Sequence, residues 1–102
     1  MKIQVTEEDI KLAFAHKGLG MDPGETCPIA QAFLRIIPTV HSIIVEDDGY
    51  VGLHIGKYNV FIGEYNVSLR PEQEETFRVQ QYIEQFDVLD IAEPAVFNFK
   101  RF

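Results

Sequence analysis

Residues 55–71 read IGKYNVFIGEYNVSLRP and contain nearly the same phrase twice, GKYNV and then GEYNV. Glycine at the first position of a two-residue loop is typical of a tight hairpin turn. We therefore interpret Gly56-Lys57 and Gly63-Glu64 as turns between antiparallel strands. This register places apolar pairs on one face, as a sheet with one buried side requires. The pairs are Ile55 with Tyr58, Leu53 with Val60, Val51 with Ile62, Ile62 with Tyr65, Val60 with Val67 and Tyr58 with Leu69.

The preceding segments, TVHSIIVE and YVGLHI, also alternate with a period of two, which indicates two more strands. Asp47-Asp48-Gly49 between them predicts a three-residue loop in which Gly49 takes the left-handed conformation. The apolar pairs that result are Val45 with Val51 and Ile43 with Leu53. A two-residue turn would shift the register by one and break this match. The sequence thus predicts a four-stranded antiparallel meander.

Two terminal strands and about three helices complete the predicted α+β fold. Thr6 is a predicted N-cap, residues 19–26 a loop, and Pro28 the first residue of the most buried helix. A third helix is expected to begin after Pro71 and to run to about Asp87. The closing strand in AVFNFKRF should lie beside the N-terminal strand at residues 2–5. The predicted order is β-α-α-β-β-β-β-α-β, with residues 1–102 as a single domain.

Composition narrows the kinds of partner. The net charge of −7 argues against direct binding to nucleic acid or to an anionic membrane, because both depend on basic side chains. No apolar run approaches the roughly 20 residues that cross a bilayer, and the first residues do not read as a signal peptide. We expect a cytoplasmic protein. A single cysteine excludes an internal disulfide.

Cys27 is the sharpest candidate for chemistry, because it stands just before Pro28 at a predicted helix N-terminus. The helix dipole and free backbone N–H groups at such a position lower a thiol pKa. A thiol enzyme also needs a base, and no histidine forms a recognisable local signature with this cysteine. We favour a structural interpretation, in which Cys27 is a buried apolar plug, and keep a reactive thiol as the alternative.

The histidines do not suggest a metal site. His41 falls on the predicted core face and His54 on the opposite face, so a shared metal is not expected, and His16 is expected to be exposed on the first helix. No glycine-rich phosphate loop or serine nucleophile motif is present. The sequence therefore predicts no metal, no cofactor and no catalytic residues.

The outer face of the predicted sheet is the more interesting surface. It would carry apolar, aromatic and amide side chains, a mixture typical of protein-binding surfaces. The candidate binding residues are Tyr50, His54, Asn59, Phe61 and Asn66. The alternative is that the first or second helix covers this face.

Several short motifs occur in an order that resembles small uncharacterised proteins encoded by bacteriophages and prophages. The motifs are VTEEDI near the start, Cys27-Pro28-Ile29-Ala30, Leu69-Arg70-Pro71-Glu72, Phe86-Asp87, and the closing stretch Pro94-Ala95-Val96-Phe97-Asn98-Phe99. The chain departs from this pattern in its longer loop before Cys27 and in its acidic balance. The resemblance implies stoichiometric binding to a host component, such as a defence enzyme, and transfers no activity or site residues.

Three functional hypotheses follow. The first is a non-enzymatic phage-type accessory protein that binds a host protein, as a homo-oligomer, through its sheet face or acidic helix ends, and inhibits host defence. The second is a small-ligand protein that binds a nucleotide signal at a subunit junction. Its ligand contacts would be Tyr50, Tyr58, Tyr65 and Arg35 or Arg70. The third is a thiol-dependent enzyme that uses Cys27.

Overall fold

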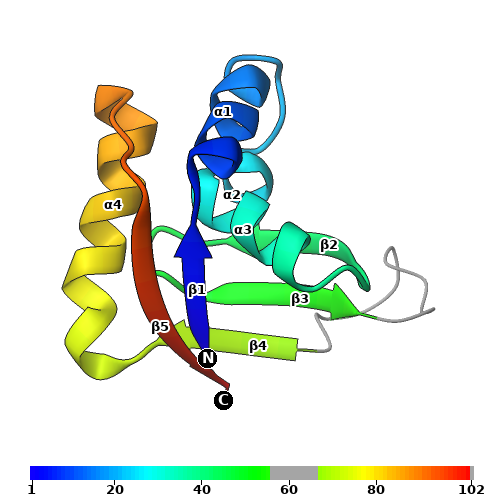
Figure 1. The fold of residues 1–102 in the computed structure, drawn as a ribbon, viewed down its shortest axis with the longest axis vertical. Helices are drawn as coiled ribbons and strands as arrows, with labels where there is room; N and C mark the ends of the chain where they lie inside the picture. The colour runs from blue at the N-terminus through cyan, green and yellow to red at the C-terminus, as the bar shows by residue number, and fades with distance from the viewer. Residues whose placement is uncertain (56–66, 102) are drawn as a thin grey trace.

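A computed structural model describes residues 1–55 and 67–101 of the chain. These residues form an α+β fold with one antiparallel sheet in the order β1-β5-β4-β3-β2 (Figure 1). The strands are β1 (Lys2–Val5), β2 (Val40–Val45), β3 (Val51–Ile55), β4 (Val67–Pro71) and β5 (Ala95–Arg101). The helices are α1 (Glu7–His16), α2 (Pro23–Thr26), α3 (Pro28–Ile36) and α4 (Thr76–Leu89), with a 3-10 turn η1 (Gln73–Glu75) before α4.

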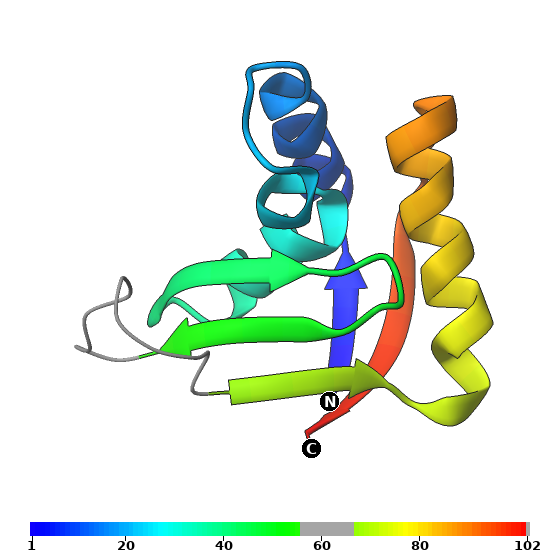
Figure 2. The ribbon, with the colours of Figure 1, turned by 180° about the vertical axis from the view of Figure 1, so that it is seen from behind.

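The sheet curls strongly, so that β1 and β5 run across the direction of β2, β3 and β4 (Figures 1 and 2). The long strand β5 joins the two parts, because residues 95–98 pair with β1 and residues 99–101 pair with β4. Ile3 lies opposite Phe97 in this pairing. The prediction that the closing strand lies beside the N-terminal strand is therefore confirmed.

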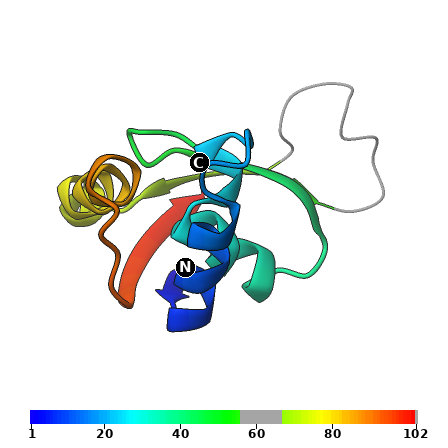
Figure 3. The same ribbon diagram turned by 90° about the horizontal axis from the view of Figure 1, so that it is seen from above.

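Helices α1, α3 and α4 share one core on the inner face of the curled sheet. Phe33 of α3 packs edge-on against Phe99 at 5.3 Å between ring centroids, and Tyr82 of α4 packs against Phe97 at 5.0 Å. Because Phe97 and Phe99 are two residues apart in β5, both helices lie on the same face. Figure 3 shows α4 standing apart from the α1–α3 group. Phe14 and Phe86 connect the two groups at 5.0 Å.

The hairpin between β2 and β3 has the predicted register. Val45 lies opposite Val51 and Ile43 opposite Leu53, and Gly49 has a φ of +88°. The pairing shifts between Val40 and Ser42, which forms a bulge next to His41. The prediction that His41 faces the core is wrong, because its side chain is exposed at this irregularity.

The pairing predicted for β3 is also wrong. β3 pairs directly with β4, with Val51 opposite Leu69 and Leu53 opposite Val67, where the prediction put Ile62 and Val60. The two predicted turns and the strand between them fall within residues 56–66, which lie outside the described part of the chain. The predicted face is nevertheless correct, because Val51, Leu53 and Leu69 are buried together.

Helix α2 occupies part of the predicted loop. Asp22 is its N-cap and accepts a hydrogen bond from the backbone N–H of Gly24 at 2.8 Å, while Pro23 takes the first helical position. Asp-Pro-Gly is a turn signal, but the same residues also satisfy the first backbone donors of a helix. The helix lies against the edge strand β2, and a Cβ atom on Gly24 would lie 2.5 Å from Cδ1 of Ile44.

A buried carboxylate connects β1, α1 and α3. Asp9 is 1% exposed and forms the capping box of α1 with Thr6. Its two oxygens accept hydrogen bonds from Arg35 at 3.1 and 3.0 Å, and Arg35 also donates to the backbone oxygen of Gln4 at 2.7 Å. Burial acts to raise the pKa of Asp9, but the bonds from Arg35 and Thr6 outweigh burial and hold it below its ordinary value.

Gly49 places the tip of the β2–β3 hairpin against α4. A Cβ atom there would lie 2.6 Å from Cγ of Pro71 and 3.1 Å from Cγ1 of Val79. Gly20 has a similar φ of +79°, but a Cβ atom there would have nothing within 4 Å.

We expect Gly20→Ala to lower the free energy of unfolding by about 1 kcal/mol through backbone strain alone. Gly49→Ala should lower it by about 3 kcal/mol, because the new methyl group also overlaps its neighbours. Urea unfolding measures both, and equal losses would show that the tip is loosely packed.

Candidate functional site

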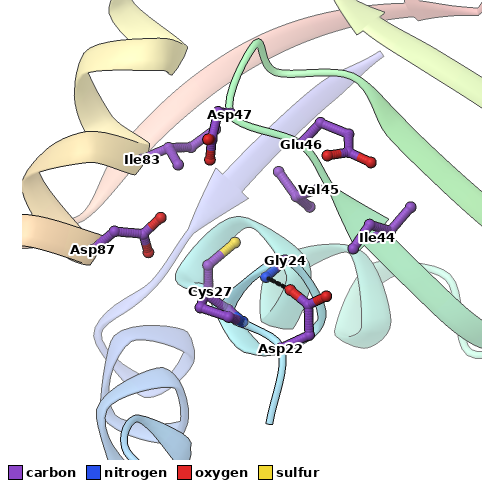
Figure 4. A pocket seen from close by; sticks show the side chains of 10 residues that line it. Asp22, Gly24, Cys27, Ile44, Val45, Glu46, Asp47, Ile83 and Asp87 are labelled. Carbon is purple, nitrogen blue, oxygen red and sulfur yellow. Dashed lines mark hydrogen bonds between the residues drawn. The ribbon is translucent and has the colours of Figure 1, made fainter.

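A cavity of about 220 Å³ lies beside the hairpin tip, between α2, the start of α3 and the last turns of α4 (Figure 4). We call it the acidic cavity, because four of its ten lining residues carry carboxylates. These are Asp22, Glu46, Asp47 and Asp87. The other lining residues are Pro23, Gly24, Cys27, Ile44, Val45 and Ile83. No lysine, arginine or histidine is among these ten residues.

The carboxylates reach the acidic cavity from separate elements. Asp47 comes from the hairpin tip and Asp87 from α4, and Figure 4 shows these two side chains facing each other near Ile83. Asp22 lies across the cavity at the start of α2, with its carboxylate held by the N–H of Gly24. Within the described residues, none of the four forms a salt bridge.

A larger hollow of about 550 Å³ continues along α4. We call it the α4 groove, and it shares Asp47, Ile83 and Asp87 with the acidic cavity. Its remaining lining residues are Gln80, Glu84 and Val88. Val88 is 69% exposed, so it gives the groove an apolar edge that is open to solvent. The two hollows thus form one acidic depression with an apolar floor and an apolar edge.

The ionisation of Asp87 is unfavourable. Burial raises the pKa of Asp87 above its ordinary value, and the carboxylate of Asp47 raises it further, while Lys17 lowers it and Asp22 adds a smaller increase. Its Oδ1 atom is shielded from solvent and accepts no hydrogen bond from the described residues. Asp87 also lies in the last turn of α4, which holds no basic residue, so the negative end of the helix dipole opposes its charge.

Lys17, the cation that lowers the pKa of Asp87, forms its hydrogen bonds with other groups. Its ammonium group donates hydrogen bonds to the backbone oxygen of Phe86 and to the carboxylate of Asp90. It also lies 4.5 Å from the centroid of the Phe86 ring. These contacts fasten the end of α1 to the end of α4 and leave the carboxylates of the acidic cavity without a paired cation in the described chain.

Cys27 points into the acidic cavity, as Figure 4 shows, but it is 2% exposed. Burial raises its pKa to about 12, although the backbone N–H groups of Ala30 and Ile29 act to lower it. The donors expected at a helix N-terminus are therefore present, and burial outweighs them. At neutral pH the group is a thiol, which is a poor nucleophile.

The predicted binding residues are only partly described. Tyr50 and His54 are half-buried, and Tyr50 places its hydroxyl 2.9 Å from Oγ of Ser68. Asn59, Phe61 and Asn66 lie outside the described residues, as do Tyr58 and Tyr65 of the nucleotide hypothesis. Ile44 on the same face is partly covered by α2 at Gly24. Tyr50 and Arg70 border a separate hollow of about 220 Å³ on the other side of the hairpin tip, together with Asp48, Pro71, Thr76 and Gln80.

The acidic depression was not predicted from the sequence. Asp22, Asp47 and Asp87 are 25 or more residues apart, and each has a local explanation as a cap, a turn residue or a helix residue. Their only common signal in the sequence is the net charge of −7, which does not locate a site. The tertiary packing of the hairpin tip on α4 brings these residues together.

Comparisons with known proteins identify no relative, because no family model, curated protein or solved structure matches the chain. Within residues 1–55 and 67–101, no cluster of histidine, cysteine and carboxylate side chains is arranged to hold a metal ion. No helix in the same residues is long and apolar enough to span a membrane.

Neutralising Asp87 should stabilise the protein. A raised pKa means that the folded state favours the protonated form, so the cost of Asp87 appears as pH rises from about 3.9, its value in an unfolded chain, through its folded pKa. Asp87→Asn should therefore gain about 1 kcal/mol at pH 7 and little at pH 3.5. Urea unfolding across this range measures the difference from the parent protein.

The matched control for this experiment is Glu74→Gln, which removes one exposed charge from the turn η1 before α4. Glu74 lines neither the acidic cavity nor the α4 groove. It should leave stability within about 0.5 kcal/mol. A loss of stability in Asp87→Asn at pH 7 would show that the carboxylate has a favourable partner. The titratable groups that influence Asp87 are Asp47, Asp22 and Cys27, which line the cavity, and Lys17, which lies outside its lining.

Cys27 should resist alkylation in the folded protein. A pKa of about 12 lowers the thiolate fraction at pH 7.5 by on the order of a thousandfold relative to an ordinary thiol. We expect iodoacetamide to label the native chain far more slowly than a cysteine peptide, and to label it at the peptide rate in 8 M urea. Mass spectrometry follows both reactions, and a native rate equal to that of the peptide would identify an activated thiol.

Proposed function

We propose that this chain is a non-enzymatic protein that binds another protein stoichiometrically through the acidic depression formed by the acidic cavity and the α4 groove. The observation that supports this proposal is a set of five carboxylates, Asp22, Glu46, Asp47, Glu84 and Asp87, around a hollow that also carries exposed apolar surface. None of the five forms a salt bridge in the described residues. Acidic and apolar groups together complement a basic, partly apolar surface of a partner.

The charge of the depression favours this function over nucleotide binding. A phosphate in the acidic cavity would meet carboxylates and no basic side chain among the residues that line it. Arg35, one of the two arginines assigned to a nucleotide by the sequence, is bound to Asp9 and Gln4 and does not line this cavity. Arg70 and Tyr50 border the separate hollow, which leaves a nucleotide there as the second candidate.

The state of Cys27 argues against the thiol enzyme. A nucleophilic cysteine needs a lowered pKa and a base within reach. Cys27 is instead buried with a raised pKa, and the carboxyl group of Asp87 raises that pKa further. An acidic neighbour opposes thiolate formation. Cys27 is better explained as a buried packing residue that fixes the start of α3 beside the cavity.

The identity of the partner as a host protein, its inhibition, and the assembly of the chain into an oligomer belong to the same proposal. They rest on the resemblance to phage-encoded proteins and on the acidic balance of the sequence. Electrostatic attraction from a net charge of −7 would speed association with a basic partner and make it sensitive to salt.

A pull-down with matched variants tests the proposal. The tagged full-length chain, the double variant Asp47→Asn/Asp87→Asn and the control Glu74→Gln are incubated with bacterial lysate in 0.15 M salt. We expect the parent and the control to retain the same protein in about a 1:1 ratio, and the double variant to retain several times less because the opposing charges are gone. Quantitative mass spectrometry measures the ratio.

The outcomes separate two failures. If none of the three baits retains a protein in stoichiometric amount, the proposed function is wrong. If all three retain the same protein equally, the chain is a binding protein but the acidic depression is not its binding site. Light scattering of the purified chain, alone and with the retained protein, gives the number of copies in the complex.

A further inference from the structure

We infer that the acidic depression receives an arginine side chain of the partner protein, with an aliphatic side chain beside it. This inference rests on the proposed function and specifies the chemistry of the partner. The arginine would enter the acidic cavity between Asp47 and Asp87, and the aliphatic side chain would lie in the α4 groove against Ile83 and Val88. The occupant is an extended or helical segment of another protein.

The arrangement of Asp47 and Asp87 suits a guanidinium group. The two carboxylates come from separate elements, the hairpin tip and α4, and both point into the cavity near Ile83, while Asp22 lies across from them (Figure 4). A guanidinium presents donors on more than one edge of a rigid plane, so it can bond to carboxylates on two sides at once. A lysine ammonium is a compact and strongly hydrated charge, and it loses more hydration on entering a partly apolar site.

The apolar residues of the acidic cavity also favour a guanidinium over an ammonium group. Ile83, Val45 and Ile44 give the cavity an apolar wall beside its acidic edge. The planar faces of a guanidinium pack on such a wall while its edges reach the carboxylates. The cavity volume of about 220 Å³ exceeds the space of a single water molecule several times over, so a guanidinium fits.

The α4 groove supplies the second contact. It shares three lining residues with the acidic cavity, so a side chain next to the arginine in a bound segment lies directly over it. Val88 at its edge is 69% exposed, and a partner that covers this side chain removes apolar surface from water, which favours binding. Glu84 and Gln80 border the groove and provide a polar rim.

Synthetic peptides test this chemistry directly. We would titrate the ¹⁵N-labelled full-length chain with a capped hexapeptide that carries arginine between two leucines, and with matched peptides that carry lysine, citrulline or glutamate instead. Free arginine is the remaining ligand. The arginine peptide should shift the amide signals of Asp47, Ile83 and Asp87, and should bind at least about tenfold more tightly than the citrulline peptide, which has the same shape without charge.

Two variants and one competition complete the experiment. Asp47→Asn/Asp87→Asn should weaken the arginine peptide about tenfold, while Glu74→Gln should change its affinity less than twofold. Equal binding of the citrulline and arginine peptides, shifts confined to another part of the chain, or equally tight binding of free arginine would overturn the inference. If the lysate retains a partner that excess arginine peptide does not displace, the inference fails and the proposed function stands. If the peptide binds but no lysate protein does, the proposed function fails alone.

Discussion

The contact between Gly49 and α4 determines the geometry of the candidate site. Without a Cβ atom and with a φ of +88°, Gly49 lets the hairpin tip approach Pro71 and Val79 more closely than another residue would permit. The tip is further held by a hydrogen bond from Gln80 to the backbone oxygen of Asp48. These contacts at the hairpin tip set the separation of Asp47 from Asp87, and hence the width of the acidic cavity.

Much of the fold follows from local patterns in the sequence. The alternation around Asp47-Asp48-Gly49 correctly gave the β2–β3 register, and Thr6 is the N-cap of α1 as expected. The repeated phrase in residues 55–71 misled for a physical reason. To bury one face of β3, Val51 and Leu53 need only lie opposite apolar residues that point to the same side of the sheet. Leu69 and Val67 of β4 meet this requirement as well as Val60 and Ile62 do. The turn residues correctly predicted which face of β3 is buried. Which strand pairs with β3 is decided by tertiary packing, which the turn residues do not reveal.

The acidic depression could not be predicted in the same way. The sequence places Asp22 in a loop, Asp47 in a turn and Asp87 at the end of an amphipathic helix. The structure confirms the last two and makes Asp22 the N-cap of the short helix α2. What the sequence lacks is the distance between them, because no periodic pattern connects a cap, a turn and a helix terminus. For Cys27 the sequence named the two competing effects, the helix N-terminus and burial. Only the buried packing around the thiol decides that burial dominates.

The treatment of carboxylates elsewhere in the chain strengthens the assignment of the site. Where an acid is buried for structural reasons, the fold provides a cation: Asp9 is bound by Arg35, and Glu75 is bound by Arg78 at 2.8 Å. Hydrogen bonds then hold the pKa of both acids below their ordinary values. Asp87 is the contrasting case, since burial and Asp47 raise its pKa and no described side chain forms a salt bridge with it. Because the same chain pairs its buried acids with arginines, the half-buried Asp87, unpaired among the described residues, is the observation on which the proposed partner site depends.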